Sequence, residues 1–154
     1  MKELLKDKSY KNLDYLKKKS RLEVFNSKLI ECNFWESYLI NSNFFNTEIM
    51  NCIFTDSNLS NSIFRDVIIK NSNFSHTDIS NCDFSKARLI NVNFRDAIYS
   101  KKTKWPKNYR IPKETMFELE KYNPFDYRTK LSYSNVKSLS EKKIRLYKKK
   151  FNKE

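Results

Sequence analysis

The chain contains no glycine, and this absence excludes several nucleotide-binding folds. The phosphate-binding loops of Walker and dinucleotide-binding folds need glycine at fixed positions, so we expect neither. Long apolar runs are also missing, since no stretch approaches the roughly 18 apolar residues of a membrane-spanning helix. Residues 1–20 are polar and lack the apolar region of a secretory signal, so we expect no such signal.

Cysteine is scarce, and its spacing argues against a fold held together by disulfides or by a metal ion. Cys32, Cys52 and Cys82 make an odd count without a CxxC pair. This pattern favours neither a disulfide framework nor a zinc knuckle, and it is typical of a reducing compartment. We therefore expect a cytoplasmic protein without a metal or other cofactor.

Negative charge is scarce at both ends of the chain. The net charge of +13 is spread as +5 over residues 1–21, −3 over residues 22–99 and +11 over residues 100–154. A mildly acidic middle between two basic ends indicates an anionic partner, unless the lysines only keep the chain soluble.

Large apolar residues recur at every fifth position through the middle of the chain. From Leu29 onward, Phe alternates with Leu or Ile, and a mostly small residue stands two positions earlier. We expect this series to form the core: Phe34, Leu39, Phe44, Ile49, Phe54, Leu59, Phe64, Ile69, Phe74, Ile79, Phe84, Leu89 and Phe94.

A period of five fits neither an α-helix nor a flat strand. A chain that turns a corner every five residues would instead point both series inward on every side. Four sides make a coil of twenty residues, and coils stack at the strand spacing of about 4.8 Å. Residues 22–99 then form about four coils. Phe falls on two opposite sides, where each ring stacks on one twenty residues away.

Short segments of this stretch match the repeating motif A(D/N)LXX. The matches include Ser42-Asn43-Phe44, Ser57-Asn58-Leu59, Ser72-Asn73-Phe74, Thr77-Asp78-Ile79 and Cys82-Asp83-Phe84. The stretch therefore resembles the pentapeptide-repeat family, which implies an all-β solenoid, the right-handed quadrilateral β-helix. The segment from Ala97 to Pro106 is similar to a closing segment of many members.

We expect helices to cover the two open ends of the solenoid. Residues 2–19 predict a helix that gives a basic N-terminal cap over residues 1–21. Beyond Pro112, a second short helix is predicted over Lys113–Tyr122 and a final one over Ser140–Phe151. Residues 100–154 would then be a basic, partly helical cap and tail.

The residue after each core position should face outward, and on the early coils these residues are large and apolar. Such a surface favours docking of another protein or of a second copy of the chain. The alternative is that the terminal helices pack over these coils. The candidate docking residues are Phe25, Ile30, Trp35, Ile40, Phe45 and Met50.

The C-terminal tail is the second candidate site. It would bind nucleic acid or an anionic membrane surface as a basic amphipathic helix, or else remain a solvated tail. The candidate anion-binding residues are Lys142, Lys143, Arg145, Lys148, Lys149 and Lys150.

Two further patterns carry less chemistry. His76 lies one coil from Asp56 and from Asp96, which is a weak metal site beside the simpler reading of an exposed histidine. Asparagines twenty residues apart, such as Asn41, Asn61 and Asn81, should form hydrogen-bonded ladders between coils.

A solenoid filled with Phe and Leu has no interior cavity, and no catalytic constellation stands out. We therefore expect a protein-interaction or scaffold module rather than an enzyme, with no small-molecule substrate. Binding of an anionic partner through the basic ends is the alternative. Some members of the family mimic DNA and act on type II topoisomerases, but that role needs a strongly acidic rod and this chain is basic.

Overall fold

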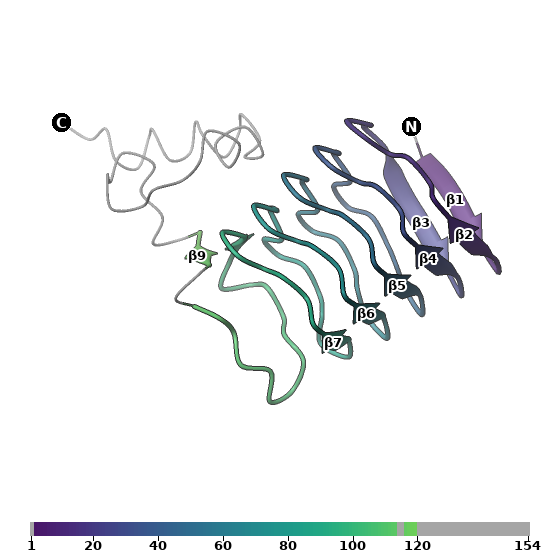
Figure 1. Cartoon of the computed structure of the whole chain (residues 1–154). Helices are drawn as coiled ribbons and strands as arrows, with labels where there is room; N and C mark the ends of the chain where they lie inside the picture. Colours follow the sequence, from purple (N-terminus) through teal and green to yellow (C-terminus); the bar gives the residue numbers. More distant parts are fainter. Residues whose placement is uncertain (1, 114–115, 120–154) are drawn as a thin grey trace.

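Residues 2–113 and 116–119 are described by the computed structural model, and no helix occurs in them. The coils stack along one axis, from the N-terminal coil in purple to the last coil in green (Figure 1). The strands are β1 (Lys2–Lys6), β2 (Ser9–Lys11), β3 (Arg21–Phe25), β4 (Lys28–Ile30), β5 (Glu48–Met50), β6 (Ile68–Lys70), β7 (Arg88–Ile90), β8 (Ile98–Tyr99) and β9 (Phe117–Glu118).

Four columns of parallel backbone pairing run along the axis, and we number them as faces 1 to 4 in chain order. Each coil therefore has four sides, as the period of five predicts. Face 1 holds β1, β3 and the bridged residues Asn43, Ile63, Asp83 and Lys104; face 2 is the sheet β2-β4-β5-β6-β7; face 3 holds Asp14, Asn33, Ile53, Asn73 and Asn93; face 4 holds Lys19, Tyr38, Asn58, Asp78, β8 and β9.

The solenoid has about six coils, so the expected number of four was too low. Where both bridged residues lie between Glu23 and Ile98, they are twenty positions apart, as Glu23 and Asn43 are. In the first coil the offset is nineteen, as between Lys19 and Tyr38, because one corner residue is missing before Glu23. The additional coils come from the two ends, which we had assigned to caps.

The predicted N-terminal helix over residues 2–19 was wrong, because this segment forms β1, β2 and the rest of the first coil. Leu5 pairs with Val24 and Tyr10 with Leu29, so the apolar period of five extends to the start of the described chain. Main-chain pairing with the second coil satisfies groups that a helix would have bonded internally. The predicted N-terminal cap is therefore, over residues 2–21, a coil of the solenoid.

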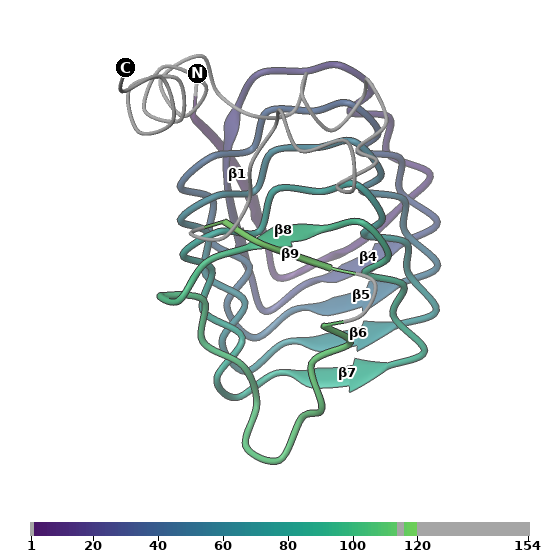
Figure 2. The ribbon, with the colours of Figure 1, turned by 90° about the vertical axis from the view of Figure 1, so that its left-hand side faces the viewer.

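The predicted second helix was also wrong over its described residues. Phe117–Glu118 is strand β9, which pairs in parallel with β8 and extends face 4 (Figure 2). The final helix predicted over Ser140–Phe151 lies outside the described residues. In residues 2–113 and 116–119 we find no helix with the length and apolar character needed to cross a membrane.

The predicted core is confirmed, with each large apolar residue pointing inward. Twelve of its thirteen members are at most 2% exposed, and Leu89 is partly buried because β7 is the last strand of its sheet. The predicted ring stacks are present, with centroids 4.5 Å apart for Phe34 and Phe54 and 4.7 Å apart for Phe44 and Phe64. Rings from opposite faces also meet edge to face, as Phe44 and Phe54 do at 6.3 Å.

Aromatic rings also end both stacks. Tyr15 stacks on Phe34 at the first coil, with centroids 5.3 Å apart. Trp105 stacks on Phe84 at the other end, at 5.5 Å, and Tyr109 stacks on Trp105. The closing segment predicted around Trp105 is thus part of the aromatic column.

Candidate docking surface

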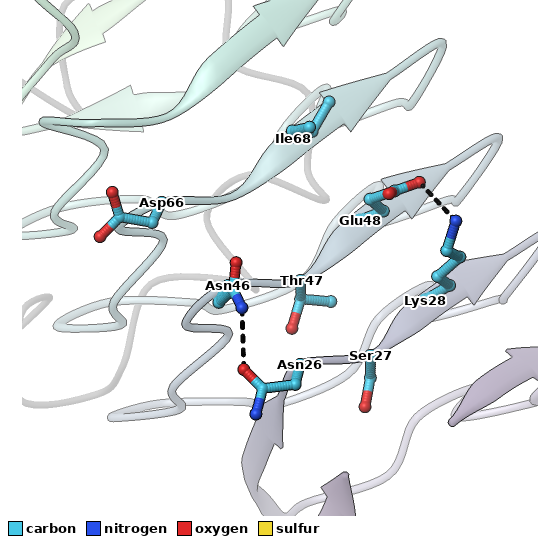
Figure 3. A pocket seen from close by; sticks show the side chains of 8 residues that line it. All are labelled: Asn26, Ser27, Lys28, Asn46, Thr47, Glu48, Asp66 and Ile68. Atoms are coloured by element: carbon cyan, nitrogen blue, oxygen red, sulfur yellow. Dashed lines mark hydrogen bonds and ion pairs between the residues drawn. The ribbon is translucent and has the colours of Figure 1, made fainter. Parts of the chain in front are cut away.

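A groove marks the corner where face 1 turns into face 2. Asn26, Asn46 and Asp66 form the corner itself, one residue from each of three successive coils, and all three have positive φ. The groove has a volume of about 240 Å³. Figure 3 shows its lining residues Asn26, Ser27, Lys28, Asn46, Thr47, Glu48, Asp66 and Ile68.

Polar contacts between coils fix the shape of this groove. Asn46 Nδ2 donates to Asn26 Oδ1 at 2.8 Å, and Lys28 Nζ lies 3.3 Å from Glu48 Oε2 (Figure 3). Both side chains of the ion pair are substantially solvent-exposed, so the pair contributes little stability, but it holds two side chains along the groove wall.

Two phenylalanines stand beside the groove on face 1. Phe25 and Phe45 each precede a corner residue of the groove, and they occupy equivalent positions in neighbouring coils. Phe45 is 40% exposed and Phe25 is partly buried. The Phe45 backbone N–H donates to Asn43 Oδ1 at 3.1 Å, which fixes the turn that presents the ring.

Two of the other candidate residues lie on the adjoining face 2. Ile30 and Met50 are directly paired in β4 and β5, and both are partly buried. The structure therefore brings Phe25, Phe45, Ile30 and Met50 to two faces that meet at the groove. We call these four residues, with the groove between them, the docking corner.

The remaining two candidate residues lie elsewhere. Trp35 is on face 3 and Ile40 is on face 4, because successive pentapeptides occupy successive faces. On face 4 the outward side chains of Asn58, Asp78 and Ser80 are buried. The six residues therefore do not form one patch.

Comparisons with known proteins agree with this architecture. One model of pentapeptide repeats matches residues 27–66 in eight copies, and a second matches residues 51–98 in nine copies. This chain is a pentapeptide-repeat protein. A search of curated proteins found no significant match.

Among solved structures, one pentapeptide-repeat protein shares the fold over most of its length, and a second protein is similar over part of it. A protein from the thylakoid lumen of Arabidopsis thaliana is 15% identical with a TM-score of 0.51, over 63% of this chain and 65% of that chain. Full-length QnrB1, a plasmid-mediated fluoroquinolone resistance protein, is 19% identical with a TM-score of 0.43, over 71% of this chain and 55% of that chain. This pentapeptide-repeat chain thus spans a little over half the length of QnrB1.

The weak metal hypothesis around His76 gains no support from the geometry. His76 Nε2 lies 3.9 Å from Asp96 Oδ2, and Arg95 Nε lies 3.5 Å from the same oxygen. Asp56 Oδ2 accepts a hydrogen bond from Trp35 Nε1 instead. Within residues 2–113 and 116–119, no group of three or more His, Cys, Asp or Glu side chains could hold a metal ion.

The buried thiols form part of the pentapeptide-repeat core. Cys52 Sγ donates to the carbonyl oxygens of Met50 and Leu29, and burial together with the neighbouring Cys32 thiol raises the pKa of Cys52. A buried thiol with a raised pKa is a poor nucleophile, so Cys52 acts as a small core residue. Cys32 and Cys82 are also buried.

The basic ends divide into a described and an undescribed part. The candidate tail from Lys142 to Lys150 lies outside the described residues. The first coil is described, and several of its cations contact acids of the second coil: Lys11 contacts Glu31 at 3.4 Å and Lys17 contacts Glu36 at 3.7 Å.

Sequence reasoning missed apolar residues that stand one position before a core residue. Ile63 and Ile68 add apolar surface on faces 1 and 2 next to the docking corner, and Ile68 also lines the groove. The sequence could have revealed them, because most residues one position before a core residue are polar in this pentapeptide-repeat chain, and an isoleucine there is an exception.

Proposed function

We propose that this pentapeptide-repeat protein is a non-enzymatic interaction module that binds another protein at the docking corner. The observation that carries the proposal is the exposed ring of Phe45 beside a groove, with Phe25, Ile30 and Met50 on the two adjoining faces. Aromatic side chains next to a concave surface supply most of the binding energy at many protein interfaces. A second copy of the chain would use the same surface in a homodimer.

Rigidity supports this role. Each docking side chain is attached to a backbone that pairs with the coils above and below it, as Ile30 and Met50 do in the sheet of face 2. Such a surface loses little conformational entropy on binding, so more of the contact energy appears as affinity.

The chemistry of the groove argues against catalysis. Glu48 is paired with Lys28, and Asp66 stands at the corner. The lining of the groove contains no histidine, no cysteine and no carboxylate other than these two. A general acid or base needs a partner group that positions its proton, and the groove contributes no histidine or cysteine for that role. We propose that the protein acts in the cytoplasm, where its three buried thiols stay reduced.

The proposal predicts that Phe25→Ser combined with Phe45→Ser strongly weakens partner binding. We would isolate partners from cells by affinity pull-down and then measure the affinity of the purified pair. Loss of two central apolar contacts should weaken binding by about 100-fold, since each costs about 1–2 kcal/mol. The matched control is Ile53→Ser, which removes an exposed apolar side chain on face 3, away from the docking corner.

Equal binding by the double variant and by the control would contradict this function. Size-exclusion chromatography of the wild-type protein separates the two kinds of partner. A dimer that the double variant converts to a monomer identifies a second copy of the chain as the partner.

Binding of an anionic partner through the basic ends is the second candidate function. Residues 1–21, which include the first coil, carry eight Lys or Arg residues. Binding of nucleic acid or of anionic vesicles should then fall steeply between about 50 and 200 mM salt, whereas docking at the apolar corner should not. A topoisomerase-binding DNA mimic fits less well, because the net charge of +13 is opposite to that of a duplex.

A further inference from the structure

Face 3 presents an exposed tryptophan that the docking corner does not use. Trp35 is 42% exposed, and its orientation is fixed from two sides. Its backbone N–H donates to Asn33 Oδ1 at 3.1 Å, and its indole Nε1–H donates to Asp56 Oδ2 at 3.1 Å. The polar edge of the ring is thus held by the protein, while part of the apolar ring is exposed to solvent.

The middle of face 3 is uncharged in a chain in which 32% of residues are charged, although the carboxylates of Glu36 and Asp56 stand at the corner beside Trp35. Along face 3 the outward residues from Asn33 to Asn93 are all neutral. Thr55 and Ser75 continue the column that starts with Trp35, and their hydroxyl oxygens lie 3.4 Å apart. Charged side chains return with Arg95 and along the corner toward face 4.

A shallow groove lies along the other edge of face 3. It has a volume of about 370 Å³, and its lining is neutral. Ile53, which is 46% exposed, joins this groove to the surface around Trp35. The lining residues are Asn51, Cys52, Ile53, Asn71, Ser72, Asn73, Asn91 and Asn93.

Ladder contacts hold the amides of this groove at the spacing of the coils. Asn91 Nδ2 donates to Asn71 Oδ1 at 2.9 Å, and Asn93 Nδ2 donates to Asn73 Oδ1 at 3.1 Å. Asn71, Asn91 and Asn93 are exposed, so their remaining donors and acceptors are available to solvent. Face 3 therefore combines an oriented aromatic ring with rows of amide and hydroxyl groups.

These features match the chemistry of a neutral carbohydrate. The face of an indole ring carries negative charge and attracts the polarised C–H groups of a pyranose, while amides and hydroxyls bond to its hydroxyl groups. The neutral lining of the asparagine groove offers no counter-charge to a charged ligand, and desolvating that charge would be unfavourable.

An extended peptide fits the same surface less well. A strand repeats its backbone groups every two residues, about 6.6 Å, whereas the coils repeat at about 4.8 Å. Proline-rich peptides dock in aromatic-lined grooves, and a donor from Trp35 to a peptide carbonyl would have to leave Asp56, to which Nε1 is bonded. A pyranose needs only the ring face of the tryptophan, so Nε1 can keep its hydrogen bond to Asp56.

We propose that face 3 is a binding site for a neutral, extended oligosaccharide, with Trp35 stacked on a sugar ring and the asparagine groove bonded to sugar hydroxyls. The site is independent of the docking corner, which lies on other faces of the solenoid. Its ligand is a glycan of neutral pyranose units rather than a protein.

The test is calorimetric titration of the full chain with cellohexaose, xylohexaose, chitohexaose and maltohexaose. Hexagalacturonate and a decaproline peptide serve as the anionic and the peptide probe. We expect at least one neutral hexasaccharide to bind and to change the fluorescence of the protein. Trp35→Ala should weaken that binding about tenfold, and Asn73→Ala or Asn93→Ala about threefold, as expected for one stacking contact and one hydrogen bond.

Matched variants separate the site from folding and from the docking corner. Trp35→Phe keeps an aromatic face and should retain part of the affinity, and Phe45→Ala on face 1 should retain all of it. Thermal unfolding of each variant checks that the solenoid is intact. Failure of all four hexasaccharides to bind, unchanged binding by Trp35→Ala, or tighter binding of decaproline would each overturn the proposal.

Discussion

At the scale of single residues, the corners of the solenoid explain the chain's many asparagines. Among residues 2–113 and 116–119, eighteen residues have positive φ, and fourteen of them are Asn or Asp. This left-handed region normally favours glycine, which the chain lacks, and Asn and Asp are the other residues that tolerate it best. The corner position thus selects Asn or Asp through the backbone, before any contact between side chains is considered.

Asn51 offers a direct measurement of this effect. Its φ is 54°, and its side chain is exposed. Asn51→Ala should lower the free energy of unfolding by about 1 kcal/mol, whereas Asn51→Gly should be close to neutral, because only alanine places a Cβ in a strained position. Urea denaturation measures both variants. Equal destabilisation by Ala and Gly would show that the lost amide, and not the backbone, matters at this corner.

The sequence anticipated the asparagine columns but not their cause. The predicted ladders are confirmed between Asn61 and Asn81 and between Asn71 and Asn91, each at 2.9 Å. The positive φ was missed because Lys17, Glu31, Glu36 and His76 occupy the same conformation, so no single residue type marks every corner.

At the scale of the element, the first coil shows how an end without a neighbour is covered. Glu3 and Lys18 occupy inward positions that are small in most later coils. Tyr15 Oη donates to Glu3 Oε2 at 2.6 Å, and Lys18 Nζ lies 4.4 Å from the centre of the Tyr15 ring. With no described coil above them, long polar side chains can extend over the open end.

These polar residues explain why residues 2–19 predicted a helix. Lys and Glu at inward positions hide the period of five, although Leu5, Tyr10 and Tyr15 keep it. The middle coils were predictable because the same apolar pattern recurs there without interruption. In the first coil, small residues are no longer required at the inward positions near the corners. The apolar pattern with a period of five is therefore weaker there.

Glu3 should make the stability of this end depend on pH. The hydrogen bond from Tyr15 lowers the pKa of Glu3, and Ser20 and Lys18 lower it further. A carboxylate whose pKa is lowered in the folded state stabilises that state above its unfolded pKa of about 4.3, and this contribution is lost as the pH falls through the folded value. Glu3→Gln should therefore destabilise the protein at pH 7 but not near pH 2.

Chemical denaturation of both proteins across this pH range gives the comparison. Tyr15→Phe is the matched variant, because it keeps the ring on Phe34 and removes the donor. It should flatten the same pH dependence. A stability difference between wild type and Glu3→Gln that stays constant down to pH 2 would rule out this coupling.

At the scale of the whole molecule, each coil contacts only its neighbours, so stability should vary along the axis. Main-chain groups of the first coil bond to the second coil, as Tyr15 N–H does to the Asn33 carbonyl at 2.7 Å, whereas a middle coil is bonded on both sides. Hydrogen exchange measured by mass spectrometry should therefore show at least about tenfold less protection over residues 9–18 than over residues 52–62.

A uniform exchange rate along the solenoid would instead indicate that all coils open together. The variant Phe54→Leu provides a control, since a weakened middle stack should raise exchange in the centre. Its effect on the first coil should be smaller if the coils open one at a time.

The arrangement of surface residues was predictable only in part. A period of five separates inward from outward positions, which is why the core was predicted almost completely. Neighbourhood on the surface follows a period of twenty, so Phe25 meets Phe45 while Trp35 lies on a different face. Treating six outward residues as one candidate surface overlooked this second period.

Each coil of twenty residues begins and ends at equivalent positions of the solenoid, and this has a consequence for how the length of the chain can evolve. A stretch such as residues 44–63 leaves and re-enters the stack at equivalent points, since Asn43 bridges Ile63 one coil on. Tandem duplication of the corresponding codons would lengthen the solenoid by one coil and leave both ends unchanged. Slippage by a number of codons that is not a multiple of five would put apolar side chains in water. Slippage by five, ten or fifteen codons would keep them inside but would move every later residue to another face, so selection should favour length variants that differ by multiples of twenty.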